Sequence, residues 1–182
     1  MATGLSNQLT RQVGEHLVTA ELGRRGIIAT PFSGNVPDAD ILAYANRKTT
    51  HIQVKTARTG KVFLDVRKYL DIEITKEGQE VKGKKREVDR KLIIVCLFLD
   101  EVAEKDDARK DEFYIFRQGW LQDHLLKTYP GRKPPLNINS FHYALQKQDV
   151  KKHIINWDLI KKELGILRAK VRPILSGISE SE

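Results

Sequence analysis

The stretch that decides the fold covers residues 37–57 and reads PDADILAYANRKTTHIQVKTA. It holds two largely apolar segments, residues 40–45 (DILAYA) and residues 51–57 (HIQVKTA), which are separated by the polar sequence ANRKT. Short segments rich in β-branched and aromatic residues, bounded by turn residues, are typical of strands. We therefore expect two strands here, joined by a turn.

The sequence before this stretch predicts a helix over residues 5–26 and a strand over residues 27–32 (IIATPF). Gly26 stands where a helix C-cap is expected. A first apolar stripe recurs at helical spacing and consists of Leu9, Val13, Leu17 and Ala20. A second stripe, Val18 and Leu22, lies on another side. We therefore expect this helix to be covered on more than one side, as when it packs on a sheet.

The sequence after this stretch predicts further strands. Residues 61–66 (KVFLDV) and 70–75 (LDIEIT) alternate in period two, and KEGQE supplies a hairpin connection, so we expect an antiparallel β extension. Residues 82–91 (KGKKREVDRK) hold six basic residues, which is typical of an exposed, mobile loop. Residues 92–99 (LIIVCLFL) are continuously apolar and predict a central strand covered on both faces.

The last third of the chain predicts a strand at residues 112–116 and helices at residues 119–129 and 157–164. Asn156 is the expected N-cap of the final helix, and Gly165 its C-cap. The expected architecture is a mixed α/β sheet flanked by helices. We expect one domain over residues 1–182, with a core over about residues 5–130 and a C-terminal helical extension over about residues 136–175.

Composition and net charge limit the kinds of binding partner and the cellular location that we expect for this protein. The chain has 182 residues, with 32 Lys and Arg against 24 Asp and Glu, a net charge of +8 that favours polyanions such as DNA. The single cysteine, Cys96, excludes an internal disulfide, and its apolar surroundings predict a buried thiol. The longest apolar run is far shorter than the roughly 20 residues of a membrane-spanning helix, so we expect a cytoplasmic protein with no membrane partner.

Polar side chains on the two predicted strands form a candidate catalytic cluster. Alternation along residues 51–57 places Gln53 and Lys55 on one face, separated by about 6.6 Å. Asp40 leads the preceding strand, directly before its apolar run. A carboxylate, an amide and an ammonium in half-buried strands need partners that satisfy them. Glu15 lies on the same side of the first helix as Val18, and it reaches this cluster if that side packs on the sheet.

These residue types suit a divalent cation and a phosphodiester. Mg²⁺, or Mn²⁺ in its place, prefers hard oxygen ligands and is often held by one or two protein groups together with substrate phosphate and water. Asp40 and Gln53 would supply two such oxygens. Lys55 would orient an attacking water, help to deprotonate it, and offset the charge that develops on the phosphorus.

The order of Glu15, PDADILA (residues 37–43) and IQVKT (residues 52–56) resembles the PD-(D/E)xK nuclease superfamily, in particular its Holliday-junction-resolvase-like branch. The resemblance implies a restriction-endonuclease-like fold and a divalent-metal-dependent nuclease. It also implies that Asp40 is the metal-binding aspartate and that Lys55 is the motif lysine. Gln53 then stands at the motif's Asp/Glu position, and Glu15 is the helix glutamate that assists the metal.

Two departures from the motif leave alternatives open. Gln53 makes this a QxK variant, and its neutral amide removes one negative charge from the metal site. Asp38 belongs to the literal Pro-Asp pair and is the alternative to Asp40, but no apolar run follows it directly. The leading expectation is a metal-dependent DNA endonuclease. The alternatives are a weak or inactive nuclease-fold protein that binds DNA, and an RNA-directed nuclease.

The resemblance leaves the DNA contacts and the assembly to be predicted separately. The basic run around Lys84, Lys85 and Arg86 is the expected contact with the nucleic-acid backbone. A homodimer is one expected assembly, since cutting a duplex requires two sites, although the sequence reveals no dimer interface.

Overall fold

The two strands expected between residues 40 and 57 form a tight hairpin in the computed structural model, which describes residues 3–34, 36–100 and 110–166. Strand β2 (Ile41–Ala45) pairs antiparallel with β3 (Lys48–Ala57). The two turn residues, Asn46 and Arg47, have φ angles of 53° and 62°. Positive φ at both turn positions matches the twist of the flanking strands, so pairing starts at once and β3 begins earlier than expected.

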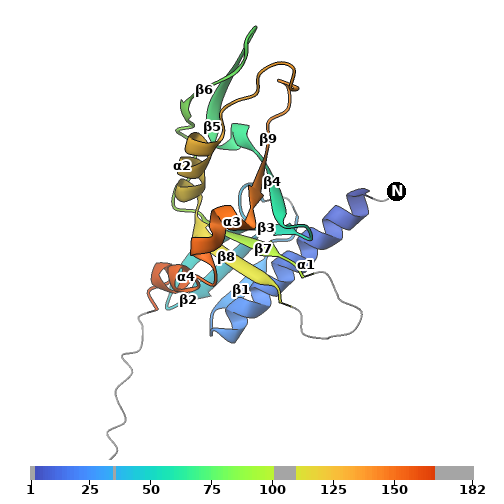
Figure 1. Cartoon of the computed structure of the whole chain (residues 1–182). Helices are drawn as coiled ribbons and strands as arrows, with labels where there is room; N and C mark the ends of the chain where they lie inside the picture. Colours follow the sequence, from blue (N-terminus) through green and yellow to red (C-terminus); the bar gives the residue numbers. More distant parts are fainter. Residues whose placement is uncertain (1–2, 35, 101–109, 167–182) are drawn as a thin grey trace, which may run out of the picture.

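A mixed sheet of five strands forms the centre of the described chain, in the order β1-β2-β3-β7-β8 (Figure 1). The remaining strands are β1 (Ile28–Pro31), β7 (Ile93–Phe98) and β8 (Glu112–Arg117). Strands β3 and β7 are parallel, whereas the other neighbours are antiparallel. Every residue of β7 is buried, which confirms the predicted central strand and, with the flanking helices, the mixed α/β class.

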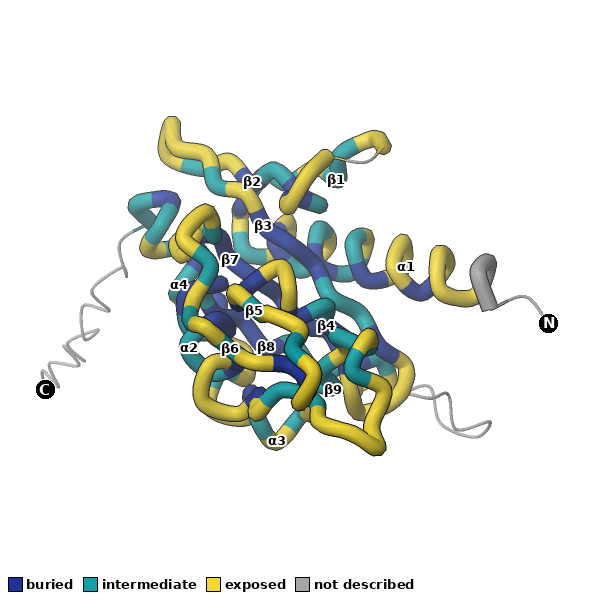
Figure 2. Tube along the Cα trace, turned by 90° about the horizontal axis from the view of Figure 1, so that it is seen from above, coloured by how far each residue is buried: buried dark blue, intermediate teal, exposed yellow. Residues whose placement is uncertain are grey.

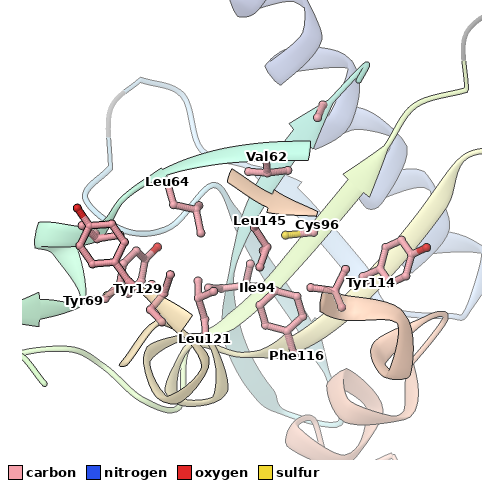
Figure 3. Close-up of a cluster of buried hydrophobic side chains, with 14 of the residues drawn as sticks. Val62, Leu64, Tyr69, Ile94, Cys96, Tyr114, Phe116, Leu121, Tyr129 and Leu145 are labelled. Carbon is pink, nitrogen blue, oxygen red and sulfur yellow. The ribbon is translucent and has the colours of Figure 1, made fainter. Parts of the chain in front are cut away.

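The sheet has a hydrophobic cluster on each face. Helices α1 (Thr3–Arg24) and α4 (Asp158–Glu163) cover one face, where Val18 and Leu22 pack with Ile52 and Val54 of β3. On the other face, α2 (Gln118–Thr128), β4 (Lys61–Asp65) and β9 (His142–Gln146) enclose a second cluster (Figure 3). Its labelled members include Val62, Leu64, Ile94, Cys96, Phe116, Leu121 and Leu145. Strand β3 therefore sends alternate side chains into two different environments, as expected.

The predicted packing of α1 is correct for one stripe and wrong for the other. Val18 and Leu22 are fully buried, but Leu9 and Val13 are 46% and 39% exposed, and the N-terminal turns extend beyond the sheet (Figure 2). The reason is a close approach at Gly14, where a Cβ atom would overlap the hydroxyl of Thr56 in β3. A glycine contact carries no hydrophobic signal, so periodicity alone predicted a covered side at Leu9 and Val13 that the structure leaves exposed.

The antiparallel extension consists of two separate ribbons. Strands β5 (Leu70–Thr75) and β6 (Gly78–Lys84) form the predicted hairpin, which projects from the molecule in Figure 1. Strand β4 instead pairs with β9, in the segment that we expected to be helical. Pairing with a strand about 80 residues away leaves no local signature, because a lone five-residue strand shows only a weak alternation.

Two further local expectations are corrected. The basic stretch at residues 82–91 is not all loop, because β6 continues through Lys84. The N-cap of α4 is Trp157 rather than Asn156, whose side-chain Nδ2 donates instead to the Ile115 carbonyl at 3.4 Å. Gly165 follows the last turn with a φ of 67°, so the helix ends where the sequence predicted. The part of residues 136–175 beyond residue 166 lies outside the described chain.

The short helical segments complete the path of the chain. These are η1 (Val66–Lys68), α3 (Lys147–Val150) and η2 (Lys151–His153). Within the described residues, no helix is long and apolar enough to cross a bilayer.

Candidate active site

Asp40 is fixed at the point where β2 begins. Its backbone N–H donates to the Ile52 carbonyl at 2.9 Å, and its own carbonyl accepts from the Phe32 N–H at 2.9 Å. Its carboxylate Oδ2 accepts from the Val54 N–H at 2.7 Å. Because Ile41 pairs with Ile52, residue 40 stands opposite Gln53 across the two strands. The hairpin register therefore brings Asp40 and Gln53 together.

Gln53 is buried but has no partner in the described part of the protein. Its exposed fraction is only 7%, and no hydrogen bond joins its amide to any described residue. The side chain lines a cleft together with Asp40 and Lys55. The amide atoms themselves are not fully buried, so they keep contact with solvent in the cleft. The amide oxygen is thus available to a ligand that enters the cleft.

Lys55 lies two residues further along β3 and is half-buried. Burial lowers the pKa of its ammonium group, Asp40 raises it in part, and the positive charge of Lys68 lowers it further. No ion pair joins Lys55 to another described residue. A lysine in this state releases its proton more readily than a solvated one.

Arg11 links Glu15 to Asp40. Its Nη2 lies 3.0 Å from Asp40 Oδ1, and its Nε lies 3.1 Å from Glu15 Oε1. The Asp40 carboxylate is 9% exposed, whereas the Arg11 side chain is 57% exposed. Helix α1 therefore places Glu15 beside the cleft but not in its lining, and Glu15 is joined to Asp40 through a guanidinium group that the sequence analysis missed. The i,i+4 spacing of Arg11 and Glu15 was its available signal.

The cleft has a volume of about 820 Å³ and is lined by α1, the start of β2, β3, β4 and η1. Its basic lining residues are Arg11, Lys55, Arg58, Lys61 and Lys68. Two acidic residues, Asp38 and Asp40, line it as well. Positive charge therefore exceeds negative charge around the cleft. Arg58, Lys61 and Lys68 were not among the predicted site residues, because isolated basic residues in turns resemble any solvated surface.

The other predicted residues are placed differently from one another. Asp38 is exposed, with a φ of 60°, and lines the cleft from the loop before Asp40. Lys85 lines a smaller adjoining hollow of about 290 Å³, which Gln53 also borders. Lys84 forms an ion pair with Asp123 at 2.6 Å, and Arg86 is exposed. The structure thus gathers Asp40, Gln53 and Lys55 and leaves Lys84 outside the cleft.

The donor set suits a hard cation that keeps part of its water. Within the described chain, no group of three or more His, Cys, Asp or Glu side chains is placed to hold a metal ion. Asp40 Oδ1 and the unpaired Gln53 amide supply two oxygen donors, and Arg11 now occupies the space between Asp40 and Glu15. Mg²⁺ is often bound through only one or two protein groups together with water and substrate phosphate. The residues therefore fit such an ion.

Comparisons with known proteins give a limited likeness to solved structures. No protein-family model matches the chain, and no curated protein matches it. Among solved structures, the chain is similar to the bacterial homing endonuclease I-Ssp6803I, with 14% sequence identity and a TM-score of 0.49. The match covers 90% of this chain and 99% of that one.

Proposed function

We propose that this protein is a metal-dependent DNA endonuclease of the PD-(D/E)xK superfamily, in its Holliday-junction-resolvase-like branch. One observation carries the proposal. Asp40 and Gln53 face each other across the β2–β3 hairpin, and Lys55 follows on the same face of β3, so that all three line one basic cleft. Oxygen donors beside a lysine in a positively charged cleft suit hydrolysis of a phosphodiester.

Asp40 and Gln53 would hold Mg²⁺ or Mn²⁺, with Glu15 in support. When bound, such an ion polarises the phosphate and lowers the pKa of a bound water. The Val54 N–H fixes the orientation of the Asp40 carboxylate, and strand pairing fixes its backbone. A ligand oxygen has to be held within about 0.5 Å of its working position, which the rigid hairpin provides and a loop residue such as Asp38 does not.

Lys55 would act on the reacting groups themselves. Its lowered pKa favours the neutral amine, which would accept a proton from the attacking water, and the ammonium so formed would stabilise the negative charge that develops on the phosphoryl oxygens. Burial beside the cleft strengthens the charge stabilisation, because water screens the interaction less there.

A second candidate function is DNA binding without cleavage, and two observations favour it. Arg11 already pairs with both carboxylates, and Gln53 contributes no charge to the site. A metal ion would have to compete with the guanidinium group for Asp40 Oδ1. Under this alternative, DNA binding persists although no cutting occurs.

Incubation of supercoiled plasmid with the protein, in Mg²⁺ and in EDTA, separates the two functions. The endonuclease proposal expects nicked or linear DNA with Mg²⁺, intact DNA with EDTA, and intact DNA with the Asp40→Asn variant in either buffer. Binding by all samples with no cutting in Mn²⁺ or Mg²⁺ would support the second function. A structured RNA of matched length, tested in parallel, addresses RNA-directed cleavage.

A homodimer is part of this proposal, since cutting both strands of a duplex requires two sites. Light scattering on the eluting gel-filtration peak would give the mass of the assembly. Mixing the parent protein with the Asp40→Asn variant would then produce dimers with one active site each. If the two sites of a dimer each cut one strand, such dimers yield nicked rather than linear plasmid.

A further inference from the structure

Three basic side chains in the cleft have no assigned role in catalysis. Arg58, Lys61 and Lys68 line it, and none of them forms an ion pair or a side-chain hydrogen bond with another described residue. The two acids of the cleft form no ion pair with them: Asp40 is bound to Arg11, and Asp38 forms no ion pair with any described residue. The cleft therefore keeps uncompensated positive charge in the described protein, which is what a bound polyanion would offset.

The three cations flank Lys55 from different elements. Arg58 directly follows β3, Lys61 begins β4, and Lys68 ends η1. Lys68 lies near enough to Lys55 to contribute to the lowered pKa of that lysine. Arg58 is three residues beyond Lys55, or about 10 Å along an extended chain. Lys68 thus places positive charge beside Lys55, and Arg58 places positive charge further along the cleft.

We propose that Arg58, Lys61 and Lys68 bind phosphates of one DNA strand, so that this strand runs along β3 through the cleft. The proposal rests on the nuclease function above and adds the path of its substrate. Each nucleotide advances the strand by about 3.4 Å along the helix axis, so Arg58 would contact a phosphate roughly three nucleotides from the one next to Lys55, and Lys61, across the turn from Arg58, would contact a neighbouring phosphate. Lys68 would contact phosphates adjacent to the cut.

The loss of three positive charges anywhere on the protein would weaken DNA binding to some extent. The test therefore compares the cleft variant with a control variant that loses the same charge elsewhere. The cleft variant combines Arg58→Gln, Lys61→Gln and Lys68→Gln. The matched control combines Lys127→Gln, Lys151→Gln and Lys162→Gln, all exposed residues that do not line the cleft. Both variants lose three positive charges. Fluorescence anisotropy with a labelled duplex, in EDTA so that no cutting occurs, measures the affinity over a range of salt concentrations.

The cleft variant is expected to bind roughly tenfold more weakly or worse, and its plot of log K against log salt is expected to be shallower by about 2.7, or about 0.9 for each lost phosphate contact. The control is expected to change that slope by less than about 0.5. Equal slopes in the two variants would overturn the proposed path.

The position of the contacts is tested on the DNA side. Methylphosphonate linkages remove one phosphate charge at a time, and they are placed singly along the strand. We expect the parent protein to lose affinity for the linkages at the cut and roughly three nucleotides away, and the cleft variant to show no further loss at these places. The same losses in both proteins would contradict the assignment.

The two proposals fail separately. Cleavage by the parent together with equal salt slopes in the two variants would overturn the phosphate path and leave the nuclease function standing. A salt slope reduced only in the cleft variant, with no cleavage by the parent in Mg²⁺ or Mn²⁺, would overturn the nuclease function and leave the path as that of a DNA-binding protein.

Discussion

The cleft and the basic segment at residues 82–91 differ in how their positive charges are used. In the segment, Lys82 pairs with Glu73 and Glu80, at 3.1 Å and 2.7 Å. Lys84 and Arg90 both pair with Asp123. In the cleft, by contrast, the side chains of Lys55, Arg58, Lys61 and Lys68 form no ion pair within the described chain.

The difference shows that a run of basic residues in the sequence indicates a high local density of positive charge, but not how many of those charges are free to bind a ligand. Hydrogen bonds from Arg90 and Lys84 lower the pKa of Asp123 to about 2, so its carboxylate stays charged at any physiological pH. Together with Lys82, three cations of the segment are therefore engaged before any ligand arrives. The basic residues of the cleft are scattered along the sequence, whereas those of the segment follow one another. We nevertheless expect the cleft to contribute more to DNA binding than the segment does.

The largest expected effect is at the metal-binding carboxylate of the cleft. Asp40→Asn should reduce Mg²⁺-dependent cleavage by roughly 10³-fold or more, because the side chain still accepts from the Val54 N–H but no longer carries charge. Asp38→Asn should cost less than about tenfold, since that residue stands in an exposed loop. Initial rates of plasmid nicking measure both. The reverse ranking would place the ligand in the loop.

The next effect is at Lys55. Lys55→Met keeps most of the side-chain volume and should lower the cleavage rate by about 10²- to 10³-fold while leaving DNA affinity nearly unchanged, because stabilisation of the transition state acts on rate rather than on binding. Single-turnover rates and anisotropy titrations separate the two quantities. Equal cleavage by the variant and the parent would remove Lys55 from the site.

The pH dependence of Lys55 gives an independent check. Below its lowered pKa the buried ammonium destabilises the fold, and this cost disappears as pH rises towards 10.5, where unfolded lysine also loses its proton. Lys55→Met should therefore raise the free energy of unfolding at neutral pH, and the gain should shrink at alkaline pH. Urea unfolding at several pH values measures this; a gain that grows with pH would contradict the assigned burial.

The geometry of the cleft depends on the close contact between Gly14 of α1 and Thr56 of β3. Gly14→Ala would place a Cβ atom against the Thr56 hydroxyl, so we expect a loss of about 1–3 kcal/mol in stability and a weaker cleavage activity as α1 shifts with Arg11 and Glu15. Gly23→Ala, in the same helix with open space around it, is the control and should change stability by less than about 1 kcal/mol. Thermal unfolding compares them.

The smallest effect is expected in the basic segment itself. The triple variant Lys84→Gln, Lys85→Gln and Arg86→Gln should weaken binding to all DNA sequences alike. It should reduce the slope of log K against log salt by about 1 or less, because Lys84 is already paired with Asp123. Asp123→Asn is the converse variant: it should release Lys84 and Arg90 and steepen the slope. A triple variant that matched the cleft variant in slope would show that both regions contact DNA equally.

Much of the fold was predictable because its signals are local. Alternation along residues 51–57 separated Ile52 and Val54, which face α1, from Gln53 and Lys55, which face the cleft side. The continuous apolar run predicted β7, and it predicted the buried thiol of Cys96, whose pKa burial raises to about 12. The placing of Asp40 beside Gln53 followed from one short hairpin, whose register is set by neighbouring residues.

The sequence by itself thus determined the strands of the central sheet, their alternation and the cluster of Asp40, Gln53 and Lys55, because period and turn chemistry act over a few residues. Only the tertiary structure decided the rest. Arg11 reaches Asp40 across 29 residues, Gly14 selects the face of α1 through Thr56, and β4 finds its partner near the other end of the chain. Such contacts depend on which distant groups fold into reach of one another, and so does the choice of which lysines are paired and which remain free for a ligand.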